Sequence, residues 1–288
     1  MLPLALVLVQ AAAAPPATDI YLADLRLVQG RITVSAPVNV TNRPGYDNQP
    51  AFLPNGRSIL YTSVRDSQAD IYRYDEKLKT SVQVTATRES EYSPTPLPDG
   101  KGFSVIRVEA DSTQRLWAFD LDGANARLVL DSIKPVGYHA WGDDHLLILF
   151  VLGAPATLQI ADAAAPRARG QVLARDIGRS LQRIPGRPAV SFLQRDSVNG
   201  PSLQEVDIRT RRVTQLVRTP AGAEFFAWTP DGIALTAGGT KLYQWNPGRS
   251  GTWQEVADLA SAGLTNITRL AVSPKGERIA IVAVPAAR

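Results

Sequence analysis

Cysteine is absent from this sequence of 288 residues, and histidine occurs only twice, as His139 and His145. Disulfide bonds and thiolate metal sites are therefore excluded. The sequence contains neither a Gly-x-Ser-x-Gly nucleophile turn nor a His-Glu-x-x-His helix motif. Because these common signatures of hydrolases and metalloproteases are missing, we assign no catalytic residue and favour a binding protein over an enzyme.

Runs of basic residues with interleaved aromatic side chains are missing as well, which argues against a nucleic-acid partner. The net charge of +4 is modest. Its excess lies mainly between Arg167 and Arg218, where arginine far outnumbers aspartate and glutamate. This segment forms either an anion-binding side or a solvated outer rim, and both interpretations stay open here.

The chain begins with a short hydrophobic stretch, MLPLALVLVQ, which is followed by small residues. This pattern is typical of a secretory signal and is too short to cross a membrane comfortably. We therefore predict that residues 1–18 are a signal-like or unstructured segment and that residues 19–288 form a mature periplasmic or secreted protein without a transmembrane span. An ordinary apolar extension is the alternative. The alanine- and arginine-rich composition indicates a bacterial protein.

The chain does contain an internal repeat with a period of 44 residues. A turn related to Pro-Asp-Gly recurs at Pro54, Pro98, Gly142, Gly186, Pro230 and Pro274. A period of about 40–45 residues built from short apolar runs is typical of β-propellers, with one four-stranded blade per repeat. The sequence therefore predicts an all-β fold, a single six-bladed β-propeller over residues 19–288, which we expect to act as a monomer.

The ends of the chain predict how the ring closes. In the first repeat, strands are expected over residues 49–54, 58–63, 70–75 and 80–85. The segment DIYLADL at Asp19 matches the third of these strands, whereas the last segment of the chain matches only the first two. We therefore expect the N-terminal strands to pair with the C-terminal strands and complete the last blade, which removes free sheet edges.

The first repeat, YDNQPAFLPNGRSILYTSVRDSQADIYRYD, resembles the repeat of the TolB-type propellers. The matching residues are Asp47, Asn48, Pro50, Phe52, Pro54, Gly56, Tyr61, Ser63, Arg65, Asp66, Asp70, Ile71 and Tyr72. The second repeat matches through Glu91, Tyr92, Pro94, Pro98, Asp99 and Gly100. The α/β domain that precedes the propeller in TolB itself has no counterpart in the short segment before Asp19.

This resemblance implies a fold more specifically than it implies a function. It implies an exported propeller of the bacterial cell envelope that binds a protein, peptide or glycan partner without catalysis. Relatives of the repeat also occur as lyases and as the gating propellers of serine peptidases. A purely structural spacer is a further alternative.

The predicted binding face is the one that carries the approach to each innermost strand and the loop between the second and third strands. The ligand-binding candidates are Asp47, Asn48, Glu91, Tyr92, Tyr138, Glu224 and Phe225. Carboxylates, an amide and aromatic rings at a channel mouth predict a binding funnel of acidic character, suited to a basic peptide. The alternative for Asp47 and Asn48 is that they only cap local turns.

An enzyme is the alternative function, namely a metal-dependent hydrolase or lyase with its site in the central channel. Six-bladed lactonases of similar architecture hold calcium with Glu, Asn and Asp, so the resemblance makes Asn48, Glu91 and Glu224 candidate ligands. The related lyases use several histidines, which His139 and His145 alone do not replace. We assign no metal or cofactor, and calcium in the channel is the alternative.

Overall fold

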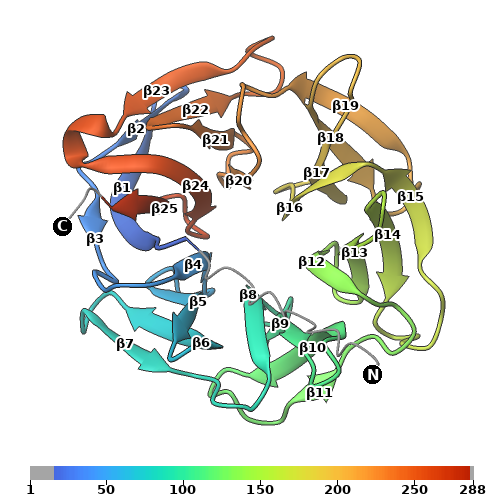
Figure 1. Ribbon diagram of the computed structural model, residues 1–288. Helices are drawn as coiled ribbons and strands as arrows, with labels where there is room; N and C mark the ends of the chain where they lie inside the picture. Colours follow the sequence, from blue (N-terminus) through green and yellow to red (C-terminus); the bar gives the residue numbers. More distant parts are fainter. Residues whose placement is uncertain (1–15, 286–288) are drawn as a thin grey trace, which may run out of the picture.

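A computed structural model describes residues 16–285 and shows six antiparallel sheets arranged around a central axis (Figure 1). The predicted all-β, six-bladed propeller is confirmed. The signal-like segment falls mostly within residues 1–15, which lie outside the described residues, as do residues 286–288. The only helix among residues 16–285 is the short η1 (Ala260–Ala262), and no helix there is long and apolar enough to span a bilayer.

Five blades are formed by consecutive strands, counted from the innermost strand outward. Blades one and two consist of β4 (Asp47–Phe52), β5 (Ser58–Arg65), β6 (Gln68–Asp75), β7 (Thr80–Gln83), β8 (Ser90–Pro96), β9 (Gly102–Val108), β10 (Gln114–Asp120) and β11 (Arg127–Leu128). Blade three consists of β12 (Val136–Trp141), β13 (Leu146–Val151), β14 (Thr157–Asp162) and β15 (Gln171–Arg175). Blades four and five consist of β16 (Ile177–Arg183), β17 (Ala189–Gln194), β18 (Ser202–Asp207), β19 (Val213–Arg218), β20 (Phe226–Trp228), β21 (Ala234–Gly238), β22 (Lys241–Trp245) and β23 (Gln254–Asp258).

The sixth blade joins the two ends of the described chain, as predicted. Its inner strands are β24 (Leu264–Val272) and β25 (Arg278–Pro285), and its outer strands are β1 (Asp19–Val28), β2 (Arg31–Val34) and β3 (Val38–Asn39). Strand β1 pairs with β25 from Asp19, opposite Ala283, to Asp24, opposite Arg278. Because the ring is closed by backbone hydrogen bonds, the long β1 and β25 strands have no free edge in this blade.

The hydrophobic core lies between the blades. Six clusters of buried apolar residues occupy the six interfaces between neighbouring blades. At the interface of blades six and one, for example, Ile20 and Val282 pack against Phe52 and Tyr61. Alternating residues of each strand face the two neighbouring blades, so an isolated blade would leave apolar surface exposed on both sides.

The repeated turns interlock on the face opposite the predicted binding face. Gly100 has φ of 69° and Gly276 has φ of 72°, a backbone region that favours glycine. A Cβ atom at Gly100 would lie 3.4 Å from Pro54, and one at Gly276 would lie 3.0 Å from Pro230. The proline of one blade therefore packs on the glycine of the next, which explains why both residues recur in the repeat.

At two places around the ring, a buried serine accepts a hydrogen bond from a tryptophan of the next blade: Ser104 from Trp141 and Ser191 from Trp228. The indole Nε1 of Trp228 donates to Ser191 Oγ at 2.8 Å, and Ser191 Oγ donates to the carbonyl of Gln182 at 3.2 Å. We expect Ser191→Ala to lower the free energy of unfolding by about 1–3 kcal/mol, because the buried indole N–H loses its acceptor. Urea denaturation measures this effect, and the exposed Ser197→Ala on the same blade serves as a control with a change of at most about 0.5 kcal/mol. Equal stability of both variants would contradict the role of this bond.

Candidate functional site

The innermost strands of all six blades line a central cavity of about 360 Å³. One level of this central cavity is formed by residues that are 44 positions apart in the sequence. These residues are Ala51, Thr95, His139, Arg183, Ala227 and Ala271. Each period of 44 residues therefore contributes one residue to this level of the cavity wall, and the six periods together complete the ring.

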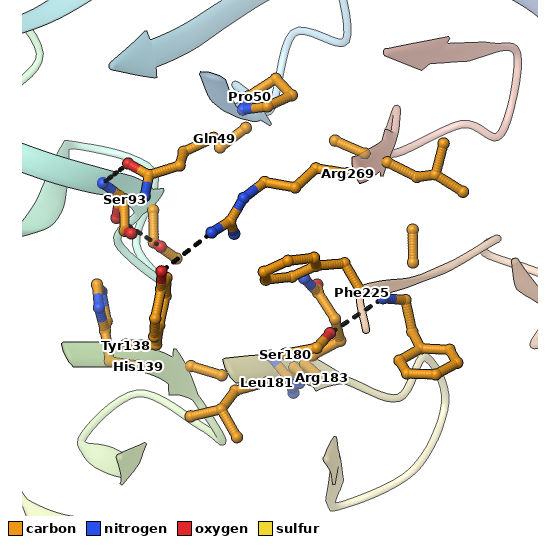
Figure 2. Close-up of a pocket in the computed structure, with 18 of the residues that line it drawn as sticks. Gln49, Pro50, Ser93, Tyr138, His139, Ser180, Leu181, Arg183, Phe225 and Arg269 are labelled. Carbon is orange, nitrogen blue, oxygen red and sulfur yellow. Dashed lines mark hydrogen bonds between the residues drawn. The ribbon is translucent and has the colours of Figure 1, made fainter. Parts of the chain in front are cut away.

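The first two innermost strands bulge where they approach the mouth of the central cavity. The pairing register shifts between Asn48 and Ala51, and the residues at this bulge include Gln49 with φ of 58°. Ser93, 44 residues later, repeats the bulge with φ of 54°. A left-handed backbone at a non-glycine residue is unfavourable unless its surroundings hold it. Here Gln49 Oε1 accepts a hydrogen bond from the Ser93 amide at 2.7 Å (Figure 2). It also accepts from Thr62 Oγ1 at 2.8 Å.

A wider hollow of about 840 Å³, the mouth hollow, lies over blades one to three next to the central cavity. It is lined by Tyr46, Tyr92 and Tyr138 and by the loops that join second to third strands, including Ser67. The predicted binding face therefore does bring the approach segments and these loops together. Burial is the main cause that raises the pKa of Tyr46 to about 12 and also raises the pKa of Tyr92. Both phenols are protonated at neutral pH and can donate hydrogen bonds.

Arg269 extends across the central cavity (Figure 2). It comes from β24 of blade six and donates through Nη2 to the hydroxyl of Tyr138 on β12 of blade three, at 3.1 Å. Blades six and three face each other across the ring (Figure 1). The guanidinium carbon also lies 3.7 Å from the ring centroid of Phe225, within the range of a cation–π contact. Two predicted site residues, Tyr138 and Phe225, are thus joined by an arginine that was not predicted.

Asp47 and Asn48 lie inside blade one and line neither the central cavity nor the mouth hollow. The Asp47 side chain is fully buried and accepts hydrogen bonds from Arg43 at 3.0 Å and from Ser63 Oγ at 2.6 Å. Asn48 Oδ1 accepts from the backbone amide of Gln49 at 2.7 Å. Both side chains therefore support the bulge and the sheet, which is the local role that the sequence left open for them.

Glu91 and Glu224 are also held by protein groups. Glu91 is fully buried, and its Oε1 accepts from Arg107 Nε at 3.1 Å and from Thr87 Oγ1. Glu224 accepts from Arg195 Nη2 at 2.9 and 3.0 Å, at a separate hollow near blades four and five. The expected acidic funnel does not form, because burial and arginine pairing remove these carboxylates from the cavity walls.

The charged groups that do reach the cavity are arginines. Arg179, Arg183 and Arg269 line the central cavity, and Arg179 also lines the mouth hollow. Sequence analysis placed no arginine at the site. Two signals pointed toward them: Arg179 and Arg183 fall within the arginine-rich segment, and Arg269 follows Phe225 by one period of 44 residues.

His139 and Ser104 contact each other but do not form a nucleophile and its base. Nε2 of His139 lies 2.7 Å from Ser104 Oγ, and Ser104 is fully buried. Ser104 Oγ also accepts from Trp141 Nε1 at 3.0 Å and lies 3.2 Å from the Thr95 carbonyl, so the hydroxyl is held inside the blade by several partners. Burial lowers the pKa of His139 to about 3, and its Nδ1 has no partner among residues 16–285. No carboxylate orients this histidine as a triad would require.

The side chains near the channel do not provide the ligands that the calcium alternative requires. Glu91 is bound to Arg107 and Glu224 to Arg195, so neither carboxylate is free to ligate an ion. Across the described part of the chain, no three His, Asp or Glu side chains gather as a metal site would need. The residues present therefore do not fit a calcium ion in the channel.

Comparison with solved structures agrees with this architecture. A TolB candidate from Agrobacterium tumefaciens superposes with a TM-score of 0.69, covering 92% of this chain and 98% of that one at 14% identity. The chain has the TolB-like six-bladed propeller fold. A chain from a nidogen–laminin complex (TM-score 0.66, 10% identity, 94% and 100% covered) and the gluconolactonase XC5397 of Xanthomonas campestris (TM-score 0.63, 10% identity, 95% and 99% covered) share the fold.

Sequence comparison is less informative than structure comparison for this TolB-like propeller. No protein-family model matches the sequence. The uncharacterized protein Atu1656 of Agrobacterium fabrum is 25% identical over 120 residues, which span 39% of this chain and 39% of that protein. Since the same fold occurs in a protein complex and in a lactonase, the neighbours alone do not select a function.

Proposed function

We propose that this chain is a non-catalytic binding module of the bacterial cell envelope that takes a protein, peptide or glycan partner at the mouth of its channel. The observation that carries this proposal is that Tyr46, Tyr92 and Tyr138 line the mouth hollow next to a central cavity that Phe225 lines and Arg269 crosses. Apolar walls with a few fixed polar groups are the usual composition of a ligand site.

The absence of a usable nucleophile and base favours binding over catalysis. Ser104 is buried, and His139 is held neutral beside it. The second histidine, His145, lies on the surface, where its Nδ1 is 2.9 Å from Asp162 Oδ1. A hydrolase or lyase would need an oriented acid and base or a metal site in the cavity; the imidazole of His139 has no carboxylate partner, and no three His, Asp or Glu side chains gather there among the described residues.

The proposed setting is the periplasm or the secreted fraction, with the propeller acting as a monomer. The signal-like N-terminal sequence and the likeness to TolB propellers support export. The closed ring satisfies the edges of its long strands internally, so the fold does not require a second copy.

A site-specific photo-cross-linker tests the binding face. We expect p-benzoylphenylalanine in place of Tyr92 to form discrete adducts in envelope extract of the bacterium that encodes the chain. The same group in place of Leu78 should form none of them, because Leu78 is exposed in a turn on the opposite face. A discrete adduct identifies the partner by mass spectrometry, and equal labelling from both positions would contradict the proposal.

An aromatic substitution adds a second measure. Phe225→Ala should reduce the adduct from the Tyr92 position at least about tenfold, since a central aromatic contact carries much of the binding energy of an interface. Tyr243→Ala, a partly buried residue of the same blade that lines neither cavity, should leave the adduct unchanged. Turnover of lactones or uronides by the purified chain, without adducts, would favour the enzyme instead.

A further inference from the structure

Among the described residues, the walls of the central cavity carry three arginines and no acidic side chain; Glu224, which accepts from the backbone amide of Arg179 at 3.1 Å, is paired with Arg195. Arg179, Arg183 and Arg269 line the central cavity, and none of the described Asp or Glu residues lines either this cavity or the mouth hollow. None of these three guanidinium groups has a carboxylate partner within residues 16–285. A concave wall lined by charges of one sign concentrates their field and attracts anions.

The lack of acid at the cavity contrasts with its surroundings. Arg43 pairs with Asp47 at 3.0 Å, Arg107 with Glu91 at 3.1 Å, and Arg195 with Glu224 at 2.9 Å. These pairs neutralise charge at the start of the innermost strands and around the mouth. Arg179, Arg183 and Arg269 have no such carboxylate partner among the described residues, and all three line the central cavity.

Arg269 is held in place but keeps most of its hydrogen-bonding capacity. A guanidinium group has five N–H donors, and only one contact, from Nη2 to Tyr138, uses them here. Its guanidinium carbon also lies over the Phe225 ring, 3.7 Å from the centroid, and this contact restricts the side chain. A pre-oriented arginine of this kind binds a carboxylate with little loss of side-chain freedom.

We propose that the cavity binds an acidic peptide segment of the partner, with its carboxylates on Arg269, Arg179 and Arg183. This inference rests on the proposed binding function and specifies the chemistry of the ligand. Arg179, shared with the mouth hollow, meets the segment first, and Arg183 lies four residues further along β16. Protonated Tyr46 adds a donor at the mouth.

Two observations favour a peptide over an acidic glycan. Sugar hydroxyl groups donate hydrogen bonds and need acceptors, whereas the charged groups of this cavity are donors only. Each innermost strand also lies at the end of its sheet, so one strand edge in every blade faces the axis. Backbone groups at such an edge can pair with an extended peptide.

Matched synthetic peptides test the inference by isothermal titration calorimetry on the full chain at low salt. The probes are acetyl-Gly-Glu-Gly-Glu-Gly-Glu-amide, its counterparts with Gln or Lys in place of Glu, and trigalacturonate. We expect the Glu peptide to bind at least about tenfold more tightly than the Gln peptide, because charge-assisted hydrogen bonds are the stronger ones. Raising the ionic strength to about 0.15 M should weaken binding through screening.

Arginine variants connect this binding to the cavity. Arg269→Gln and the double variant Arg179→Gln/Arg183→Gln should each lose at least about tenfold in affinity for the Glu peptide. Arg212→Gln is the matched control, since Arg212 is exposed on blade four and lines neither cavity. The double variant changes two exposed side chains without partners, so it keeps the test valid should Arg269→Gln reduce stability.

The outcomes separate this inference from the proposed function. Equal binding of the Glu and Gln peptides, preference for the Lys peptide, or full affinity in the arginine variants would each overturn the acidic ligand. Tighter binding of trigalacturonate than of the Glu peptide would overturn the choice of a peptide. No binding of any probe would also overturn the inference. The proposed function is judged separately, by adducts from the Tyr92 position.

Discussion

Glu91→Ala is expected to lower the free energy of unfolding by about 3–5 kcal/mol. Glu91 is fully buried, and Arg107, only 7% exposed, donates to it at 3.1 Å. The Arg107 guanidinium also lies 4.5 Å from the ring centroid of Trp117, away from water. Removal of the carboxylate leaves a buried cation without a counterion, which is among the largest single-residue costs in a folded protein. Urea denaturation measures the change.

A surface ion pair provides the control for this prediction. Glu255 and Lys241 are 2.8 Å apart but both remain substantially exposed. Glu255→Ala should therefore change the free energy of unfolding by less than about 1 kcal/mol. The double variant Glu91→Leu/Arg107→Leu should recover part of the stability lost in Glu91→Ala, since it removes both buried charges. A Glu91→Ala protein as stable as the wild type would make Glu91 available again as a ligand-binding residue.

Acidification is expected to destabilise the fold through His139. Burial lowers the pKa of His139 from 6.5 to about 3, so between these values the unfolded chain binds a proton at this residue and the folded chain does not. Stability is therefore present above pH 6.5 and is lost as the pH falls toward 3. The contribution approaches about 1.4 kcal/mol per pH unit within this window.

His139→Gln isolates the histidine from other titrating groups. Burial raises the pKa of Asp47, Asp70 and Glu91, so these carboxyl groups favour the folded state at low pH and oppose the effect of His139. The difference in stability between wild type and His139→Gln should fall with decreasing pH, and chemical denaturation at several pH values measures it. A constant difference from pH 7 to pH 4 would show that His139 titrates normally in the folded protein.

Much of the fold could be read from the sequence because its signal is periodic. The 44-residue spacing predicted the number of blades, and the match between Asp19–Leu25 and the third strand predicted the closure of the ring. The same alternation of strands and turns predicted which loops share a face, and Ser67 and Gln114 line the mouth hollow accordingly. Blade number, ring closure and loop placement depend on the order of strands and turns along the chain, and each repeat keeps that order.

The candidate site was harder to predict, because a bulge changes which residues face the axis. A shift of one residue reverses the side of a strand on which a side chain lies. The bulge after Asn48 leaves Asp47 inside the blade and brings Gln49 to the cavity, and the bulge at Ser93 does the same beside Glu91. Neither Gln49 nor Ser93 is a glycine, and the signal that could have marked the bulges is the proline that follows each of them, Pro50 and Pro94.

The sequence by itself determined the propeller, its six blades, its closure and which loops share a face, because apolar periodicity and turn chemistry act locally and repeat. Only the tertiary structure decided the charge of the cavity. Whether a carboxylate or an arginine remains unpaired depends on partners far away in the chain, as Glu91 with Arg107 and Arg269 with Tyr138 show. Asp47, Glu91 and Glu224 are paired with arginines, whereas Arg179, Arg183 and Arg269 line the cavity without a carboxylate partner among the described residues.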